Sequence, residues 1–219
     1  MHWTRKERSY GLAVLLAAVA GIIYNSWPLG YWLNPAASKR GLASELEAFH
    51  QPYDWLFIVL DVMSGVLIAI VMWLLWHREH DKWRKAVLVN FALFGLFTLL
   101  SAVLPMSCEP SLESCPSVWH QPLLILHGIT SILASLCLFA SAVIMWWLKR
   151  KHPTWFIMSI LMTGWGLFGL FSLYFLIIPG PGYIAEHYYI TLCSVWVVLL
   201  PFMVGRVPMS RDPDSAKQK

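Results

Sequence analysis

The sequence predicts an all-α polytopic membrane protein, a six-helix transmembrane bundle with both termini on the cytoplasmic side. Three observations predict it: the composition, the length of the apolar stretches and the placement of the positive charges. Of 219 residues, 58% are hydrophobic and 13% are charged, against about a quarter charged in an average soluble domain. A soluble fold of this size cannot bury so much apolar surface. A water-soluble enzyme and a disordered chain are therefore both excluded.

Six stretches are apolar over the roughly 20 residues that a helix needs to cross a membrane. They are residues 10–29, 55–76, 86–105, 121–148, 154–178 and 187–206. Backbone groups in hydrocarbon need internal partners, and the stretches lack the alternation of barrel strands, so each is expected to be a helix. The first stretch follows a basic start and contains Ala-Val-Ala at 18–20, which is typical of a signal-peptide cleavage site. Its apolar character continues to Trp27, so we expect this first helix to be retained.

Positive charges predict the orientation, because Lys and Arg concentrate in short cytoplasmic loops. In a six-span arrangement all but two of the 16 Lys and Arg residues fall on the side of the termini, and Lys39 and Arg40 fall on the other. The net charge of +4 reflects this bias, not nucleic-acid binding. The expected location is the bacterial cytoplasmic (inner) membrane. The expected segments are a basic N-terminus at 1–9, a transmembrane domain at 10–206 with outer loops at 30–54, 106–120 and 179–186, and a tail at 207–219.

The longest outer loop, 30–54, is expected to contain a short interfacial helix over 44–50. Leu42, Leu46 and Phe49 would share one face of that helix. The loop would serve either as an ordered cap over the bundle or as a lid that moves in function.

The cysteines fall into two kinds. Cys108 and Cys115 lie in the second outer loop, on the oxidising side of the membrane, which predicts a disulfide. A soft-metal site built from these two cysteines and Met106 is the alternative. Cys137 and Cys193 lie within helices and are expected to be small packing residues.

Ionisable residues inside membrane spans are costly and mark candidate functional sites. Asp54 and Asp61 are two helical turns apart on one face of the second span, and Ser64 follows one turn later. Comparable polar positions occur in the outer halves of the other spans: Thr98, Ser101, His120, His127, Ser131, Ser135, Ser172, Tyr174, His187, Thr191 and Ser194. These positions predict a polar cavity that opens to the outer face and is lined by spans two, four and six. Asp61 and His127 would be its deepest ionisable members.

Several chemistries fit such a cavity. Metal-assisted hydrolysis could draw on His50, Asp61, His120, His127, Glu186 and His187, although the sequence has no compact metal motif. Asp61 could instead orient His127 as a base, with Ser64 or Ser131 as nucleophile. Haem ligation by His127 and a second histidine, and binding of a lipid headgroup without chemistry, are further alternatives. The structural alternative is that these polar groups only pack between helices.

Two sequence blocks resemble a known family. The first reads Ser-Glu-Leu at 44–46, Gln-Pro-Tyr-Asp-Trp-Leu-Phe at 51–57 and Asp-Val-Met-Ser-Gly at 61–65. The second reads Leu-Pro-Met-Ser-Cys at 104–108, followed by Cys115, His120, His127 and Ser131. Over residues 10–205 the chain resembles a bacterial family of six-span proteins that is catalogued only as a domain of unknown function. A fainter similarity, in topology and in the Ser-acidic pair of the first outer loop, connects it to the eukaryotic Frag/DRAM/Sfk membrane family. The resemblance implies six helices and an outer-face cluster, and it implies no activity. Glu47-Ala48 stands where the family pattern leads us to expect a glycine.

The leading hypothesis is that an outer-facing polar pocket binds, and hydrolyses or transfers, a lipid or small amphiphile. The catalytic candidates are Asp61, His127 and Ser64. The ligand-binding candidates are His50, Glu45, Asp54, His120, Ser131, Glu186 and His187. A divalent metal remains an open alternative, and the expected partners are membrane lipids and not nucleic acid. The competing hypotheses are a non-enzymatic stress, sensor or scaffold protein and a haem or metal redox protein. The sequence shows no inverted repeat of the kind that many transporters have.

Overall fold

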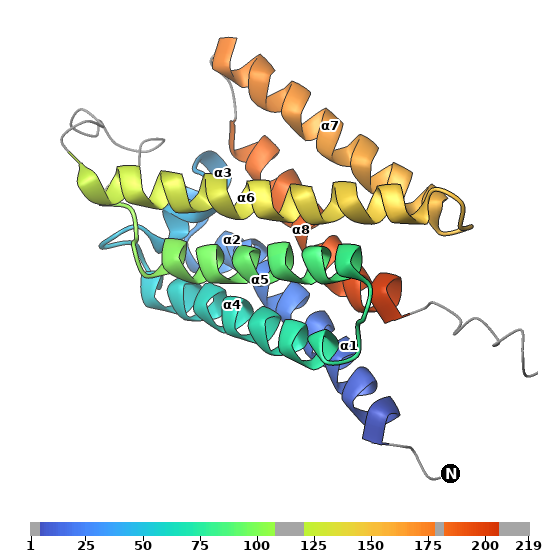
Figure 1. The fold of residues 1–219 in the computed structure, drawn as a ribbon. Helices are drawn as coiled ribbons and strands as arrows, with labels where there is room; N and C mark the ends of the chain where they lie inside the picture. Colours follow the sequence, from blue (N-terminus) through green and yellow to red (C-terminus); the bar gives the residue numbers. More distant parts are fainter. Residues whose placement is uncertain (1–4, 108–120, 178–181, 206–219) are drawn as a thin grey trace, which may run out of the picture.

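The computed structural model describes residues 5–107, 121–177 and 182–205, and this part of the chain is helical without strands (Figure 1). Its long helices are α1 (Arg5–Tyr24), α4 (Asp54–Trp76), α5 (Lys82–Ala102), α6 (Pro122–Lys149), α7 (Trp155–Ile177) and α8 (Gly182–Gly205). Among the described residues, all of these except α7 include a stretch long and apolar enough to cross a membrane, and α7 has a shorter one over Trp155–Phe168. The predicted all-α polytopic membrane fold is confirmed.

The helix ends differ from the predicted ends where local chemistry outweighs hydropathy. α1 ends at Tyr24, and a 3-10 helix, η1 (Trp27–Leu29), follows it. Pro28 lies in η1 and cannot continue the α-helical hydrogen bonding. α8 begins at Gly182, five residues before the predicted start, so Glu186 lies in a helix and not in an outer loop. Hydropathy places the start too late because Glu186 is charged, although its carboxylate has hydrogen-bond donors within the protein.

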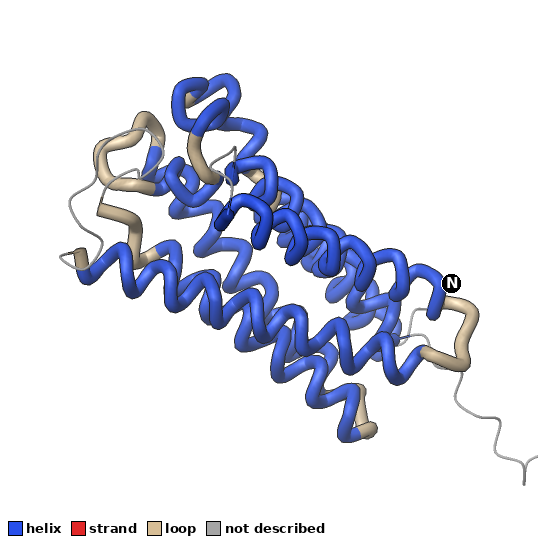
Figure 2. Tube along the Cα trace, turned by 90° about the horizontal axis from the view of Figure 1, so that it is seen from above, coloured by secondary structure: helices blue, strands red, loops and turns tan. Residues whose placement is uncertain are grey.

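The six long helices form a closed ring. Neighbours in contact are α1 with α4, α4 with α5, α5 with α6, α6 with α7, α7 with α8, and α8 with α1. Figure 2 shows the helices running along the length of the molecule. Most of the buried residues between them are apolar, with Trp196, Phe91 and Phe94 among the largest. This core fills the bundle over most of its length, and most of the buried polar side chains lie toward the end that carries the segment between α1 and α4.

Glycines bring α4 and α5 into close contact near the middle of the two helices. A β-carbon built on Gly65 would lie 2.6 Å from the carbonyl oxygen of Gly95, and one on Gly95 would lie 2.8 Å from Ile68. Only residues without a side chain allow the two backbones this separation. The close approach fixes the position of α4 relative to α5. It also fixes Asp61, which lies one turn before Gly65.

The segment between α1 and α4 forms an ordered cap, which we define as residues 30–53. It contains α2 (Gly30–Leu33), α3 (Pro35–Arg40) and a second 3-10 helix, η2 (Ala43–Glu47). Leu46 is 1% exposed and packs with Ala37 and with Phe57 of α4. These contacts support the ordered-cap alternative of the sequence analysis.

The predicted interfacial helix over 44–50 is wrong in kind and in orientation. The segment is a five-residue 3-10 helix, and Leu46 faces the protein whereas Phe49 is 42% exposed. Three residues per turn do not keep Leu42, Leu46 and Phe49 on one stripe. Burial of Leu46 inside the protein removes the apolar face that would have entered the membrane surface.

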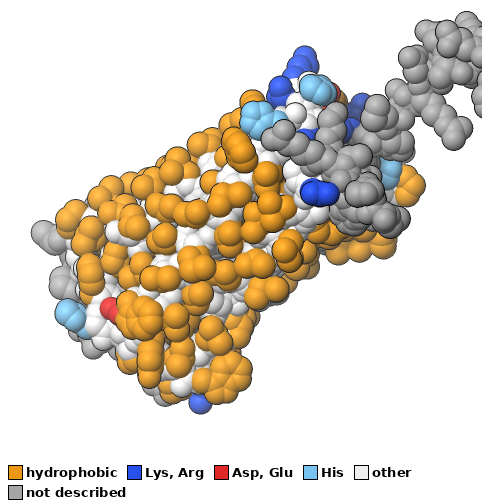
Figure 3. Space-filling model, turned by 90° about the horizontal axis from the view of Figure 1, so that it is seen from below, with side chains coloured by type: hydrophobic (Ala, Val, Ile, Leu, Met, Phe, Trp, Pro, Cys, Tyr) orange, Lys and Arg blue, Asp and Glu red, His pale blue; other side chains and the backbone are white. Residues whose placement is uncertain are grey.

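The face of the bundle seen in Figure 3 is apolar along its length, as a lipid-facing surface requires. Basic side chains gather at one end of the molecule in this view. At the end away from the cap, two of them lie over aromatic rings, Arg78 over Tyr10 at 5.5 Å and Lys85 over Trp76 at 5.1 Å. The cap and these basic contacts therefore lie at opposite ends of the helices.

Candidate functional site

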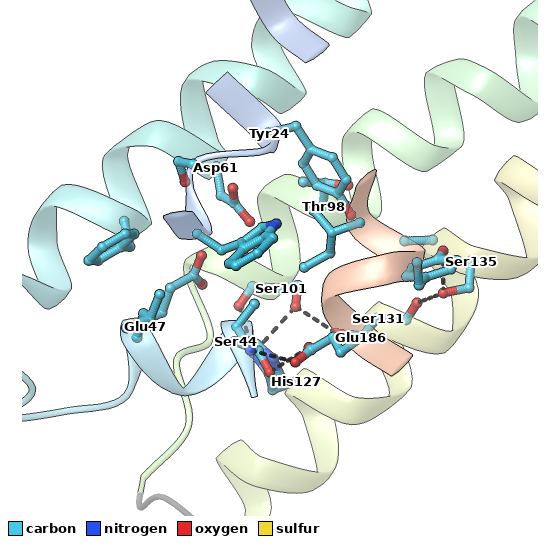
Figure 4. A pocket seen from close by; sticks show the side chains of 18 residues that line it. Tyr24, Ser44, Glu47, Asp61, Thr98, Ser101, His127, Ser131, Ser135 and Glu186 are labelled. Atoms are coloured by element: carbon cyan, nitrogen blue, oxygen red, sulfur yellow. Dashed lines mark hydrogen bonds between the residues drawn. The ribbon is translucent and has the colours of Figure 1, made fainter. Parts of the chain in front are cut away.

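A cavity of about 100 Å³ lies between the cap and the adjacent ends of α1, α4, α5, α6 and α8 (Figure 4). Its lining is mixed, with carboxyl, hydroxyl, imidazole and aromatic groups from segments far apart in the sequence. The polar residues that line it are Tyr24, Ser26, Ser44, Glu47, Asp61, Thr98, Ser101, His127, Ser131, Ser135, Glu186 and Tyr189. The cavity is the polar end of an otherwise apolar core.

Two carboxyl groups lie close together in the wall of this cavity. Glu47 comes from η2 of the cap and Asp61 from the second turn of α4; both line the cavity, and Asp61 acts on Glu47 as a hydrogen-bond partner and as a charge. Burial raises the pKa of Glu47 well above its usual range, and the charges of Asp61 and Glu186 raise it further. A close pair of buried carboxyl groups is most stable when it holds one proton, because two adjacent negative charges repel.

A third carboxylate, Glu186, joins α8 to the cap. Its Oε2 accepts a hydrogen bond from the Ala43 backbone N–H at 2.5 Å, and its Oε1 accepts one from the Ser44 hydroxyl at 2.9 Å. The Ser44 backbone N–H is a further donor to Glu186. Ala43 and Ser44 are the first two residues of η2, whose N–H groups have no partner within the helix. Glu186 thus caps η2 from a different helix and holds the cap over the cavity.

Glu45 has a local role within the cap. Its side chain is fully buried, and its Oε2 accepts a hydrogen bond from the backbone N–H of Leu42 at 3.1 Å. A β-carbon on Gly41 would lie 2.3 Å from the same oxygen, so the chain passes closely over this carboxylate. Glu45 stabilises the turn into η2, and it lies beside the cavity without lining it.

His127 of α6 is bound to the end of α5. Its Nδ1 lies 3.1 Å from the carbonyl oxygens of both Ser101 and Leu104, and 3.3 Å from the Ser101 hydroxyl. Carbonyl oxygens only accept, so Nδ1 carries the ring proton and donates it. In the neutral ring, Nε2 is then the basic nitrogen. The Ser101 hydroxyl lies 2.9 Å from that of Ser131, which extends the network along α6.

The deeper wall of the cavity has one satisfied and one unsatisfied hydroxyl group. The Tyr189 hydroxyl donates to Ser135 Oγ at 2.7 Å, which joins α8 to α6. Thr98 of α5 lines the same cavity and is 4% exposed, yet its Oγ1 has no hydrogen-bond partner in the described part of the chain. An unpaired buried hydroxyl is uncommon in proteins and requires an explanation.

The structure brings four of the predicted site residues together. Asp61, His127, Ser131 and Glu186 all line the one cavity, as Figure 4 shows. However, Asp61 does not orient His127 as the sequence analysis expected. Asp61 interacts with Glu47, and His127 donates to the carbonyl oxygens of α5. Those carbonyls lie at the C-terminal end of α5, where the Ser101 oxygen also accepts from the Leu104 backbone N–H at 3.1 Å. A helix end offers acceptors that the sequence does not display.

Other predicted residues lie away from the cavity. Ser64 is buried and donates to the carbonyl oxygen of Ala20 on α1, so it joins two helices and is not placed as a nucleophile. Asp54 accepts from the Trp55 backbone N–H at the start of α4. His50 is exposed, in a left-handed backbone conformation.

His187 also lies outside the cavity. Its ring stacks on that of Trp27, with 3.9 Å between centroids and 5° between planes. The step of one residue from Glu186 turns its side chain toward η1, since neighbouring helix positions point about 100° apart.

Some predictions fall on residues outside the described part of the chain. Cys108, Cys115 and His120 belong to this group, so the predicted disulfide remains a prediction. Cys193 is buried and Cys137 is partly buried, and both are free thiols. The described residues contain no group of three His, Cys, Asp or Glu side chains arranged to hold a metal ion.

Sequence reasoning missed Glu47 and the two tyrosines, Tyr24 and Tyr189. Glu47 lies in a loop, where a carboxylate is ordinary, and only the packing of η2 onto α4 turns it toward Asp61. Thr98 and Ser101 were noted as polar positions of their span but were not chosen as site residues. Their position near the end of that span, at the level of Asp61, was the signal that could have identified them.

The fold and the site define a multi-pass helical membrane protein with a capped polar cavity at one end of its bundle. The model of one family, described as protein of unknown function (DUF998), matches residues 12–204, and the chain belongs to that family. The predicted membership in a family catalogued only as a domain of unknown function is therefore confirmed. No curated protein and no solved structure gives a significant match to the chain.

Proposed function

We propose that this protein binds a lipid or another amphiphile by enclosing its polar head in the capped cavity. The observation that carries the proposal is the contrast between this cavity and the rest of the molecule. Polar groups from six elements converge on it, whereas the main core cluster is hydrophobic and the face of the bundle seen in Figure 3 is apolar. A cavity of that kind, with a few convergent polar groups beside hydrocarbon, suits a molecule with one polar and one apolar end.

The contacts of His127 favour binding over hydrolysis. A serine nucleophile needs a neighbouring nitrogen that can accept its proton. The nitrogen next to Ser101 is Nδ1, which donates to the two carbonyl oxygens and cannot accept a proton at the same time. Ser131 contacts the Ser101 hydroxyl and not the imidazole. Hydrolysis or transfer of the bound amphiphile therefore remains the weaker part of the hypothesis.

The expected membrane topology specifies which leaflet would supply the ligand. With both termini in the cytoplasm, the capped end faces the outer side of the bacterial inner membrane, because the basic ends and the cap are opposite. The second outer loop, with its predicted Cys108–Cys115 disulfide, would lie on the same side. The ligand would then be an outer-leaflet lipid or an amphiphile that enters from outside the cell.

Binding is tested with the purified protein in a non-ionic detergent. Probes with a common 12-carbon chain and different head groups (dodecylamine, dodecanol and dodecanoate) are added, and the thermal unfolding midpoint and the dissociation constant are measured. Ala134 lines the cavity from α6, and Ala134→Leu places three further carbon atoms there. Ala140→Leu, on the same helix but not on the cavity, is the matched control.

The proposal expects at least one probe to bind the wild type and the control, with binding lost in Ala134→Leu. Equal binding to all three proteins would mean that the probes associate with the outer surface, and the proposal would be wrong. If Ala134→Leu does not fold, Ala134→Val provides a milder form of the same comparison, because it adds two carbon atoms to the cavity.

A further inference from the structure

The charges of the cavity indicate which head group it selects. Three carboxyl groups line it, those of Glu47, Asp61 and Glu186. Of the described residues that line the cavity, none is Lys or Arg. A buried group of carboxylates without a cation is unfavourable unless protons or a bound cation offset the charge.

The three carboxyl groups differ in how their oxygen atoms are used. Glu186 accepts from two backbone N–H groups and one hydroxyl of the cap, so its charge has fixed donors. Glu47 and Asp61 have each other as partners, and one proton between them leaves further oxygen lone pairs toward the cavity. The carboxyl oxygens that can still accept a hydrogen bond are therefore those of this pair.

Thr98 gives independent evidence for a missing ligand. Its hydroxyl is buried in the cavity wall and has no partner among the described residues. Leaving such a group unpaired costs about 1–3 kcal/mol. Thr98 lines the same cavity as Glu47 and Asp61. One donor group held there would meet the carboxyl pair and the Thr98 oxygen together.

The volume limits the size of this donor group. About 100 Å³ equals the liquid volume of about three water molecules. A primary ammonium with its first methylene groups is of that size and offers three N–H donors. A phosphate ester is larger and negatively charged, and a quaternary ammonium has no donor for Thr98.

We propose that the cavity is a site for the primary ammonium group of an alkyl amine, held by Glu47, Asp61 and the Thr98 hydroxyl. The inference rests on the proposed function and specifies its ligand class: an amphiphile with a primary amine head. The ammonium donates to the carboxyl oxygens and to Thr98 Oγ1, and the proton shared by the acid pair leaves when the cation enters. The alkyl chain extends from the cavity into the surrounding hydrocarbon.

The test compares dodecylamine with dodecanol, dodecanoate and dodecyltrimethylammonium on the wild type and three variants. Asp61→Asn and Thr98→Val each remove one part of the site. Asp54→Asn is the matched control, since Asp54 lies on the same helix but is not among the described residues that line the cavity, and its carboxylate accepts from the Trp55 backbone N–H. Dodecylamine should bind the wild type about tenfold or more tightly than dodecanol, the gain expected of a charge-assisted hydrogen bond. Asp61→Asn and Thr98→Val should lose that preference, and Asp54→Asn should keep it.

The outcomes separate this inference from the proposed function. Equal binding of dodecanol and dodecylamine, lost in Ala134→Leu, would overturn the amine site and leave amphiphile binding intact. Tighter binding of dodecanoate or of the trimethylammonium probe would also overturn it. Dodecylamine binding that is the same in Asp61→Asn, Thr98→Val and Ala134→Leu as in the wild type would overturn both proposals. Propylamine separates the two sources of the head group: binding as tight as that of dodecylamine would support the ammonium site but refute the role of the alkyl chain.

Discussion

The substitution Thr98→Val tests most directly whether the Thr98 hydroxyl awaits a ligand in the cavity, because stability should rise while amine binding weakens. Valine keeps the branched shape of threonine and replaces the hydroxyl with a methyl group. The Thr98 hydroxyl is buried without a partner among the described residues, so its removal relieves a desolvation cost of about 1–3 kcal/mol. The ligand-free variant should therefore be more stable than the wild type by an amount in that range.

The free energy of unfolding is measured in detergent by a denaturant titration without added amphiphile. Thr130→Val is the matched control, because the Thr130 hydroxyl donates to the carbonyl oxygens of Leu126 and His127. Loss of a satisfied hydrogen bond costs about 0.5–1.5 kcal/mol, so the control should not gain stability. Dodecylamine should stabilise the wild type more than Thr98→Val. If Thr98→Val loses stability as Thr130→Val does, its hydroxyl has a protein partner, and the argument for a missing donor is refuted.

Three further predictions follow from the acid pair, the cap and the helix contact. Below the ordinary pKa of glutamic acid, about 4.3, Glu47 is protonated in the folded and the unfolded chain. Because the folded-state pKa of Glu47 is raised, its favourable contribution to the free energy of unfolding is present in this acidic range. The contribution is lost as pH rises through the folded-state pKa, where Glu47 ionises beside Asp61 and Glu186. Tyr24 and His127 are other titratable groups that line the cavity. Unfolding midpoints measured from acidic to alkaline pH should fall with pH in the wild type and less so in Glu47→Gln, and parallel curves would contradict this. Glu186→Gln replaces one acceptor oxygen with a donor amide, so amide hydrogen exchange over residues 43–47 should accelerate while exchange in α4 stays unchanged. Unaltered exchange in the cap would show that Glu186 does not hold it. Gly65→Ala should cost about 1–3 kcal/mol through overpacking against α5, whereas Gly128→Ala meets no atom within 4 Å and should be neutral or slightly stabilising; equal effects in unfolding titrations would refute the close contact.

Asp61 and His127 show how much of a site can be predicted from the spacing of residues in the sequence. Both residues were selected as buried ionisable groups in the outer halves of their spans, and both line the cavity. Their pairing with each other was wrong, because each found a nearer partner that the sequence conceals. Asp61 contacts a carboxyl group from the cap, and His127 donates to carbonyl oxygens at the end of α5.

Ser64 and Glu186 illustrate two ways in which one-dimensional patterns mislead. Ser64 shares the stripe of Asp61 by spacing, yet it faces α1 and donates to Ala20. A step of three residues rotates a side chain by about 60° relative to the first, which is enough to reach a different neighbour. Glu186 was assigned to a loop because hydropathy is low there, although its hydrogen bonds with η2 satisfy it inside a helix.

Composition and hydropathy alone determined the membrane class, the helical fold and the approximate ends of the spans. They do so because hydrocarbon imposes the same demand on every residue of a span, namely apolar side chains and internally paired backbone groups. The sequence also identified the individual polar residues in the outer halves of the spans, since each of them departs from the apolar pattern. Only the tertiary structure decided which of these polar residues contact one another. Partners such as Glu47 and the α5 carbonyls come from a loop and a helix end, where the membrane imposes no pattern and packing of the cap sets the geometry.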